Sequence, residues 1–351
     1  ERALEHALRA ATPETALAWA RGLGRAGRVE ALRTLWQRIQ DASPAARAAV
    51  LAALSFCGFA PELDWLSLLA SEDATLRHAA ADALRFAPPR LLADALEHTF
   101  VAADWSLRVR ALCAGVAAGD AVSWQRCIGL SRSAPAQSGP LLALVALLGG
   151  QHEHTYLLRA LEFPTARRDA LWALGFAGTV RAAETCLAAM QDAQHARVAA
   201  EAFCTITGLD LARENLIVTL PEPAFELPAL EDDDLDADLV PGADEDLPYP
   251  DLQGVATWWA QHKARFHSEV RYLSGRPASF ATLRSAFDQV ATRRRHALSL
   301  ALSARTGGAC VLQPWAFTRV QRSQQRGFPE LSPTVLNSIA RGLGFARLES
   351  A

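Results

Sequence analysis

The sequence predicts an all-α protein, an α-solenoid of stacked helix pairs followed by a C-terminal helical domain. The first observation behind this prediction is composition. Half of the 351 residues are apolar but only 7% are aromatic, and Ala and Leu dominate. Both are strong helix formers, whereas the β-branched and aromatic residues that favour strands are scarce. The second observation is a segment that recurs every 29 to 31 residues.

The recurring segment is a run of small and apolar residues at helical spacing, as in RAAVLAALSFCG and RRDALWALGFAG. Its six copies begin at Arg47, Arg77, Arg108, Ser138, Arg167 and Arg197. Eleven positions later stand Gly58, Pro88, Gly119, Gly149, Gly178 and Gly208. Because Gly adopts the left-handed conformation that closes a helix, each copy is predicted to be one helix that ends there. A weaker copy runs from residue 16 to residue 27.

Second amphipathic segments, such as EALRTLWQRIQ, lie between the copies. A pair of antiparallel helices cannot bury its apolar faces alone, so neighbouring pairs are expected to stack. An acid precedes the first residue of five copies by four to six positions, where it can accept hydrogen bonds from free helix amides. These acids are Asp41, Asp73, Asp104, Glu162 and Asp192.

The step from an acid to an Arg, into a small-residue helix closed by Gly, resembles the short HEAT repeat over about residues 10 to 210. The resemblance implies a superhelical scaffold for macromolecules, although a minority of HEAT proteins are enzymes. It also implies a structural polar ladder at the turns between repeats, formed by Asp41, Arg47, Asp73, Arg77, Asp104, Arg108, Arg167, Asp192 and Arg197. The alternative is that the recurring Arg faces a shared binding groove. In the fourth copy Ser138 replaces Arg and prolines flank it, which predicts a kink.

Charge divides the chain into three predicted parts. Residues 1–213 form the solenoid, with 21 acids and 21 bases. Residues 214–251 are a Pro-rich segment with 13 acids and no base, which is typical of a linker or an extended strip. Residues 252–351 form a basic helical domain, with 14 bases and four acids. The acidic segment is predicted to contact the basic domain at least in part, although an acidic partner could bind there instead.

The C-terminal domain carries a second resemblance. Its runs VRYLSGRP and RRRHALSLAL, followed by Trp315 and the region Arg322–Gln324, resemble an uncharacterised bacterial family of HEAT-repeat proteins often encoded near type VI secretion genes. The resemblance implies an accessory role in secretion and brings no catalytic residues. The expected partner is another protein, such as an effector or a spike component. Because unpaired charge steers an acidic partner, the candidate contacts are Arg271, Arg276, Arg293, Arg294 and Arg295.

The sequence offers no signature of an enzyme. Nucleophile elbow, phosphate loop, dinucleotide fingerprint and paired metal-binding His motifs are all missing, so we expect no catalytic residues, no metal and no cofactor. His152 and His154 are interpreted as a surface cluster. Nucleic acid is the second hypothesis, because Arg293 to Arg295 could contact phosphates, and a HEAT-type metalloenzyme is the third. The longest apolar run is too short to span a bilayer. The six cysteines show no close pairs, so we expect no disulfide framework and a location in the reducing cytoplasm.

Overall fold

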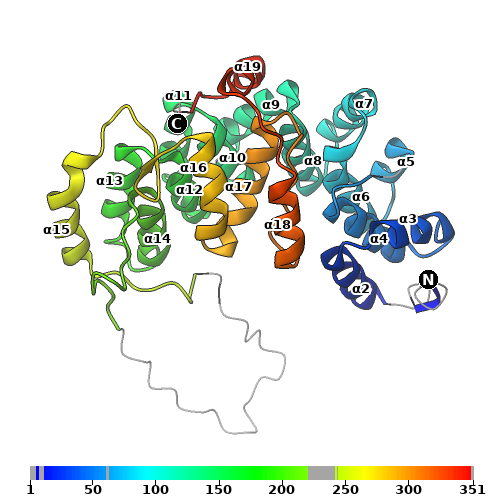
Figure 1. The fold of residues 1–351 in the computed structure, drawn as a ribbon, viewed down its shortest axis with the longest axis horizontal. Helices are drawn as coiled ribbons and strands as arrows, with labels where there is room; N and C mark the ends of the chain where they lie inside the picture. The colour runs from blue at the N-terminus through cyan, green and yellow to red at the C-terminus, as the bar shows by residue number, and fades with distance from the viewer. Residues whose placement is uncertain (1–4, 8–11, 61–62, 220–241, 243, 349–351) are drawn as a thin grey trace, which may run out of the picture.

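The computed structural model describes residues 5–7, 12–60, 63–219, 242 and 244–348. Nearly all regular structure in these ranges is helical, with only two strands of two residues each. The prediction of an all-α protein is therefore confirmed (Figure 1).

Helix pairs follow one another from residue 13 to residue 207, and we call them the array. The first helices of the pairs form a row in which each packs on the next. They are α2 (Pro13–Ala26), α4 (Pro44–Phe56), α6 (Ala74–Ala83), α8 (Trp105–Ala118), α10 (Gly139–Leu148), α12 (Pro164–Ala177) and α14 (Ala196–Thr207). The second helices are α3 (Val29–Arg38), α5 (Trp65–Leu69), α7 (Pro89–Phe100), α9 (Ala121–Ser133), α11 (Gln151–Ala160) and α13 (Val180–Ala189).

The row helices end close to the predicted residues. Gly58, Gly119, Gly178 and Gly208 all have positive φ, the conformation that a side chain disfavours. Gly149 closes α10 with extended backbone instead. The copy with Pro88 ends α6 at Ala83 and continues as a 3-10 turn, η1 (Leu84–Phe86). The spacing of the copies in the sequence therefore matches the spacing of the row helices along the chain.

Helix starts depend on more residue types than the acids. Asp73 and Asp104 cap α6 and α8 by accepting hydrogen bonds from the backbone N–H groups three residues on. Ser43 has this role in α4, and Asp41 does not cap that helix. Before α10 a 3-10 turn, η2 (Pro135–Gln137), replaces the acid.

Residues 252–348 turn back along the array. Their elements are α15 (Leu252–His262), η3 (Lys263–Arg265), β1 (Tyr272–Leu273), β2 (Arg276–Pro277), α16 (Phe280–Gln289), α17 (Thr292–Arg305), α18 (Thr318–Arg326) and α19 (Pro333–Leu343). The strands β1 and β2 pair antiparallel. Helix α17 packs against both α8 and α10, and one hydrophobic cluster runs from the array into these elements. Residues 252–348 thus share a core with the array from α8 onward.

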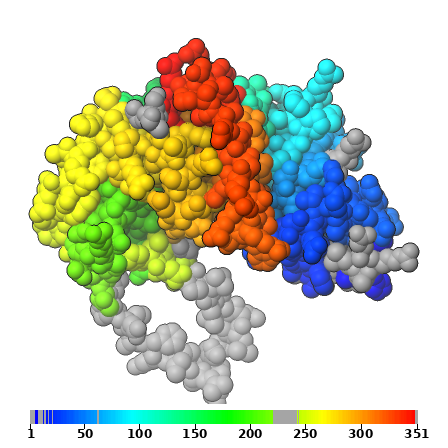
Figure 2. Space-filling model, in the orientation of Figure 1, coloured from blue at the N-terminus to red at the C-terminus, as the bar shows by residue number. Residues whose placement is uncertain are grey.

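The return path follows the C-terminal ends of the row helices. Tyr272 N–H donates to the Gly178 carbonyl at 2.7 Å, and Ser274 N–H donates to that of Thr205 at 2.6 Å. Further along, the Ser303 hydroxyl donates to the Ala117 carbonyl at 2.9 Å. Figure 2 shows the result as a continuous band, coloured from yellow to red, whose orange part lies beside the blue N-terminal helices. We call residues 271–346 the return segment.

The described ends of the acidic segment lie side by side. Ile217 and Pro250 form an isolated antiparallel bridge, and Val218 N–H donates to the Tyr249 carbonyl at 2.9 Å. Residues 220–241 and 243, which include most of the predicted acidic segment, lie outside the described residues. Residues 244–251 run back to α15.

Candidate functional site

Arg271, a predicted partner contact, lies inside the protein. Its guanidinium donates to the carbonyls of Ala177 (2.9 Å), Gly149 (3.1 Å), Ala146 (2.6 Å) and Phe176 (3.0 Å). It thus neutralises the exposed carbonyl ends of α10 and α12, where a cation is favoured. Burial lowers the pKa of Arg271 to about 10. The prediction that Arg271 binds a partner is wrong, because each of its three side-chain nitrogens donates to carbonyls of the fold.

Arg294 is also buried, with 1% of its surface exposed. It forms a two-pronged ion pair with Glu201 on α14 and donates to the Trp172 carbonyl at 3.2 Å. Its prediction as a partner contact is wrong for the same reason. The sequence did hold a signal: Arg294, Leu298 and Ala301 follow helical spacing, so they share the buried face of α17.

The other three predicted arginines lie nearer to the surface. Arg276 is exposed on β2. Arg295 donates to the Val290 carbonyl at 3.1 Å, next to the end of α16. Arg293 points outward from α17 and meets a carboxylate of the acidic segment, which makes it the starting point of the candidate site.

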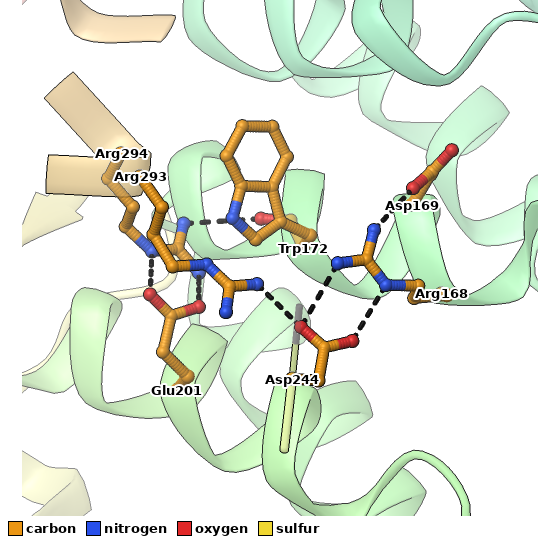
Figure 3. A network of polar contacts seen from close by, with 7 residues as sticks. All are labelled: Arg168, Asp169, Trp172, Glu201, Asp244, Arg293 and Arg294. Atoms are coloured by element: carbon orange, nitrogen blue, oxygen red, sulfur yellow. Dashed lines mark hydrogen bonds and ion pairs between the residues drawn. The ribbon is translucent and has the colours of Figure 1, made fainter. Parts of the chain in front are cut away.

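Arg293 and Arg168 hold Asp244 between them (Figure 3). Arg168, on α12, binds both carboxylate oxygens, Nε to Oδ2 at 2.7 Å and Nη2 to Oδ1 at 3.0 Å. Arg293 Nη2 lies 2.7 Å from Oδ1. We call these two side chains the arginine clamp. The predicted contact between the acidic segment and the basic domain is confirmed at Asp244.

Electrostatics keeps this contact ionised. Burial opposes the charge on Asp244, but hydrogen bonds from Arg168 and Arg293 outweigh it, so the pKa of Asp244 lies below its usual value. The hydrogen bond with Asp244 raises the pKa of Arg168. Nearby, Arg197 donates to the Leu247 carbonyl at 3.0 Å and adds a backbone attachment for the same segment.

A hollow of about 420 Å³ lies beside the clamp, between α10, α12 and α17. Its apolar lining comes from Pro140, Ala143, Leu144, Ala297 and Leu300. Arg168, Asp169 and Arg293 supply charge at its polar side, and Trp172 and His296 complete the wall. Trp172 Nε1 and His296 Nε2 are buried without a hydrogen-bond partner among the described residues. The hollow therefore combines apolar surface with positive charge.

Exposed aromatic rings continue the surface beyond His296. The ring of Trp315 lies 4.8 Å from that of His296, and 53% of Trp315 is exposed. Phe317, two residues on, is 52% exposed at the start of α18. Helix α18 presents Arg319 and Arg322, which make no hydrogen bond or ion pair with residues of the described ranges. We call Trp315, Phe317, Arg319 and Arg322 the aromatic–basic face.

The predicted ladder residues lie at the turns between copies. Arg77 pairs with Asp104 at 3.6 Å, and Arg167 pairs with Asp192 at 3.8 Å, so each pair joins one copy to the next. The side chains of Arg77, Arg108 and Arg167 also donate to a carbonyl six residues earlier, at the end of the preceding helix. Within the described ranges the buried Nε of Arg47 has no hydrogen-bond partner, and Asp41 is exposed.

The two histidines that are interpreted above as a surface cluster differ in exposure. His152 is exposed and shares a hydrogen bond of 2.8 Å with the Tyr156 hydroxyl. His154 is only 6% exposed, and its Nε2 lies 3.1 Å from the Ala146 carbonyl. Burial, together with the positive charge of Arg271, lowers the pKa of His154 to about 3. The surface interpretation of His154 is wrong, because the residue lies on the face of α11 that packs on α10.

Across the described ranges, no three His, Cys, Asp or Glu side chains gather as metal ligands would. All six cysteines are free thiols. No helix in the part of the chain that the structure describes has the length and apolar character needed to cross a membrane. Comparison with protein-family models and with curated protein sequences finds no match to this chain.

Proposed function

We propose that this protein is a HEAT-type solenoid that binds another protein as a non-catalytic scaffold or adaptor. Three features support the solenoid: the thirty-residue period, the row of stacked first helices, and the ion pairs that join successive copies. The return segment covers the C-terminal ends of the row helices. We therefore expect a partner to bind the surface that the array and the return segment form together.

The aromatic–basic face carries the proposal of protein binding. A large aromatic ring that stays half exposed does not contribute the free energy that its full burial would give the folded protein. Trp315 and Phe317 lie two residues apart and adjoin two arginines without partners in the described ranges. Trp, Phe and Arg are enriched where proteins bind proteins, and Trp and Arg are frequent energetic hot spots. A protein partner would bury the rings and pair the charges.

The resemblance of the C-terminal runs to a secretion-linked family narrows the proposed partner. We propose a type VI secretion effector or spike component, held in the cytoplasm without turnover. Such cargo needs loading or holding before export, which is a task for a surface that binds and releases. No cofactor or metal has a part in this function.

The test is capture of candidate partners from cells that express the genes neighbouring this one. Wild-type protein should retain one of their products. Replacing Trp315 and Phe317 by Ala should reduce capture by tenfold or more, since each hot-spot ring contributes about 2 kcal/mol. Phe163→Ala is the matched control, because Phe163 is similarly exposed but lies at the turn between α11 and α12. Equal capture by the double variant and the wild type would contradict the proposal.

Nucleic acid is the second candidate, favoured by the same arginines beside stacking rings. It predicts that purified protein binds a single-stranded oligonucleotide with steep salt dependence. Binding of this kind that is lost in the Trp315 and Phe317 variant, without capture of any protein, would replace the first proposal by the second.

A further inference from the structure

We propose that the arginine clamp and its hollow bind an acidic peptide of the protein partner, and that Asp244 occupies the carboxylate position in the free protein. This inference rests on the proposed function, because it names the chemistry of the partner. The peptide site differs from the partner surface of the proposed function in its residues, which lie on α12 and α17 and not on the aromatic–basic face.

The clamp shows which group it selects. A planar guanidinium that meets both oxygens of one carboxylate is the strongest arrangement that Arg offers a carboxylate. Arg168 has this arrangement with Asp244, and Arg293 adds a third hydrogen bond from another element. The two arginines come from residues 125 positions apart, so the site exists only when the return segment lies on the array. Figure 3 shows them converging on one carboxylate.

Local charge favours a carboxylate over a phosphate. Asp169 lies within reach of Arg168, with Nη1 to Oδ1 at 3.0 Å, and it also lines the hollow. Among the described residues, Arg168 and Arg293 face the carboxylates of Asp169 and Asp244, so these four charges balance. A monoanion can replace Asp244 without changing this balance, whereas a dianionic phosphate would add repulsion from Asp169.

The hollow favours a peptide over a free carboxylate as the ligand of this site. It adjoins the clamp, and its apolar wall suits a side chain such as Leu next to the acid. The rings of Trp172 and His296 add further surface to this wall.

The position of Asp244 leaves it accessible to an exchanging carboxylate. It lies in a turn of the acidic segment and keeps part of its side chain exposed. Its segment is otherwise attached by Arg197 to backbone carbonyls and by the bridge at Pro250. As a tethered competitor it acts at an effective concentration near the millimolar range, so it weakens the binding of a peptide from solution. Removing its carboxylate should therefore strengthen such binding.

The test measures fluorescence anisotropy of a labelled peptide with the sequence of residues 239–250, LVPGADEDLPYP, added to the full chain. Asp244→Ala protein should bind this peptide at least ~10-fold more tightly than wild-type protein, because the tethered competitor is gone. Asp246→Ala is the matched control; Asp246 is exposed in the same segment, and this variant should bind like the wild type. Adding Arg168→Gln to Asp244→Ala should abolish the gain.

The peptide itself supplies a second control that is independent of folding. A version with Asn in place of the Asp that corresponds to Asp244 should lose the gain on Asp244→Ala protein. Equal affinity of wild type and Asp244→Ala, or equal affinity of the two peptides, would overturn the inference. Tighter binding of an oligonucleotide than of the peptide to Asp244→Ala would overturn it too. Because both peptide arms leave Trp315 and Phe317 intact, failure here leaves the capture experiment to judge the proposed function.

Discussion

Arginine has two different tasks in this protein, and sequence position alone does not separate them. Arg271, Arg294 and Arg305 place their charge inside, on helix-end carbonyls or on Glu201. Arg319 and Arg322 keep theirs at the surface. Thus part of the positive charge of the C-terminal residues serves to attach them to the array, and only the remainder is available to a partner.

Replacing Arg271 should test the first task. Arg271→Ala removes a donor from four carbonyls at the ends of α10 and α12, of which only that of Ala146 keeps another described side-chain partner, His154. It should therefore lower the free energy of unfolding by on the order of 3 kcal/mol. Thermal denaturation checks this. Arg276→Ala, an exposed change on the adjoining strand, should stay within about 0.5 kcal/mol of the wild type. Similar denaturation midpoints for the two variants would show that the Arg271 hydrogen bonds contribute little.

His154 should make stability depend on pH. Its pKa is about 3 when folded, against about 6.5 when unfolded, so the unfolded chain binds a proton between these values and the folded chain does not. Stability should therefore fall as pH decreases from 6.5 toward 3, by about 2 kcal/mol at pH 5 from this residue. His154→Gln should reduce that slope in urea denaturation series, whereas the exposed control His98→Gln should not.

Glycine at the ends of the row helices has a role beyond closing them. Gly178 and Gly208 have positive φ, and the return segment lies directly against both. A side chain at either position would meet backbone atoms of residues 272 to 275. The same residues thus end the helices and leave room for the chain that returns over them.

Alanine substitutions separate these effects. A Cβ at Gly178 would lie 2.4 Å from the Tyr272 carbonyl oxygen, at a φ of +72°. Gly178→Ala should therefore destabilise the protein by at least about 2 kcal/mol. Gly129, inside α9, has nothing within 4 Å of such a Cβ, and Gly129→Ala should stabilise by about 0.5–1 kcal/mol. Denaturation midpoints that move in the same direction would contradict this account.

At the scale of the whole molecule, two parts that differ in charge share one core. The hydrophobic cluster that contains Leu144 and Leu171 of the array also contains Leu298 and Leu302 of α17. Backbone hydrogen bonds at Gly178, Thr205 and Leu148 join the same two parts. Apolar burial on this scale, and not the charge difference, dominates the attachment.

Cutting the chain should leave the parts together. A protease site inserted after residue 229 and cleaved in the purified protein should give two fragments that elute as one species in size-exclusion chromatography. Because the shared core is apolar, their association should persist at 1 M NaCl, where contacts between exposed charges are screened. Separation of the fragments at high salt would show that charge holds them.

The local sequence predicted helices and their ends well, because spacing and Gly conformation act within a few residues. The clamp was not predictable in this way. Arg168, Asp244 and Arg293 are far apart in sequence, and no periodic pattern connects an acid in a Pro-rich segment with two helices. Arg294 was misplaced because three consecutive arginines suggested a surface, whereas helical spacing with Leu298 placed one of them inside. Long-range contacts fixed the site, and a single sequence does not report them.

The direction of synthesis adds a consequence of the return path. Residues 1–213 leave the ribosome before the return segment exists, and the last hundred residues take roughly 5–20 s at ordinary elongation rates. During that time α8 and α10 lack α17, and the carbonyls at Ala146 and Gly149 lack Arg271. Contacts between such distant residues also form slowly. We therefore expect the nascent array to expose the apolar surface of α8 and α10 that α17 later covers. A chaperone would bind there until the C-terminal residues pack onto the array.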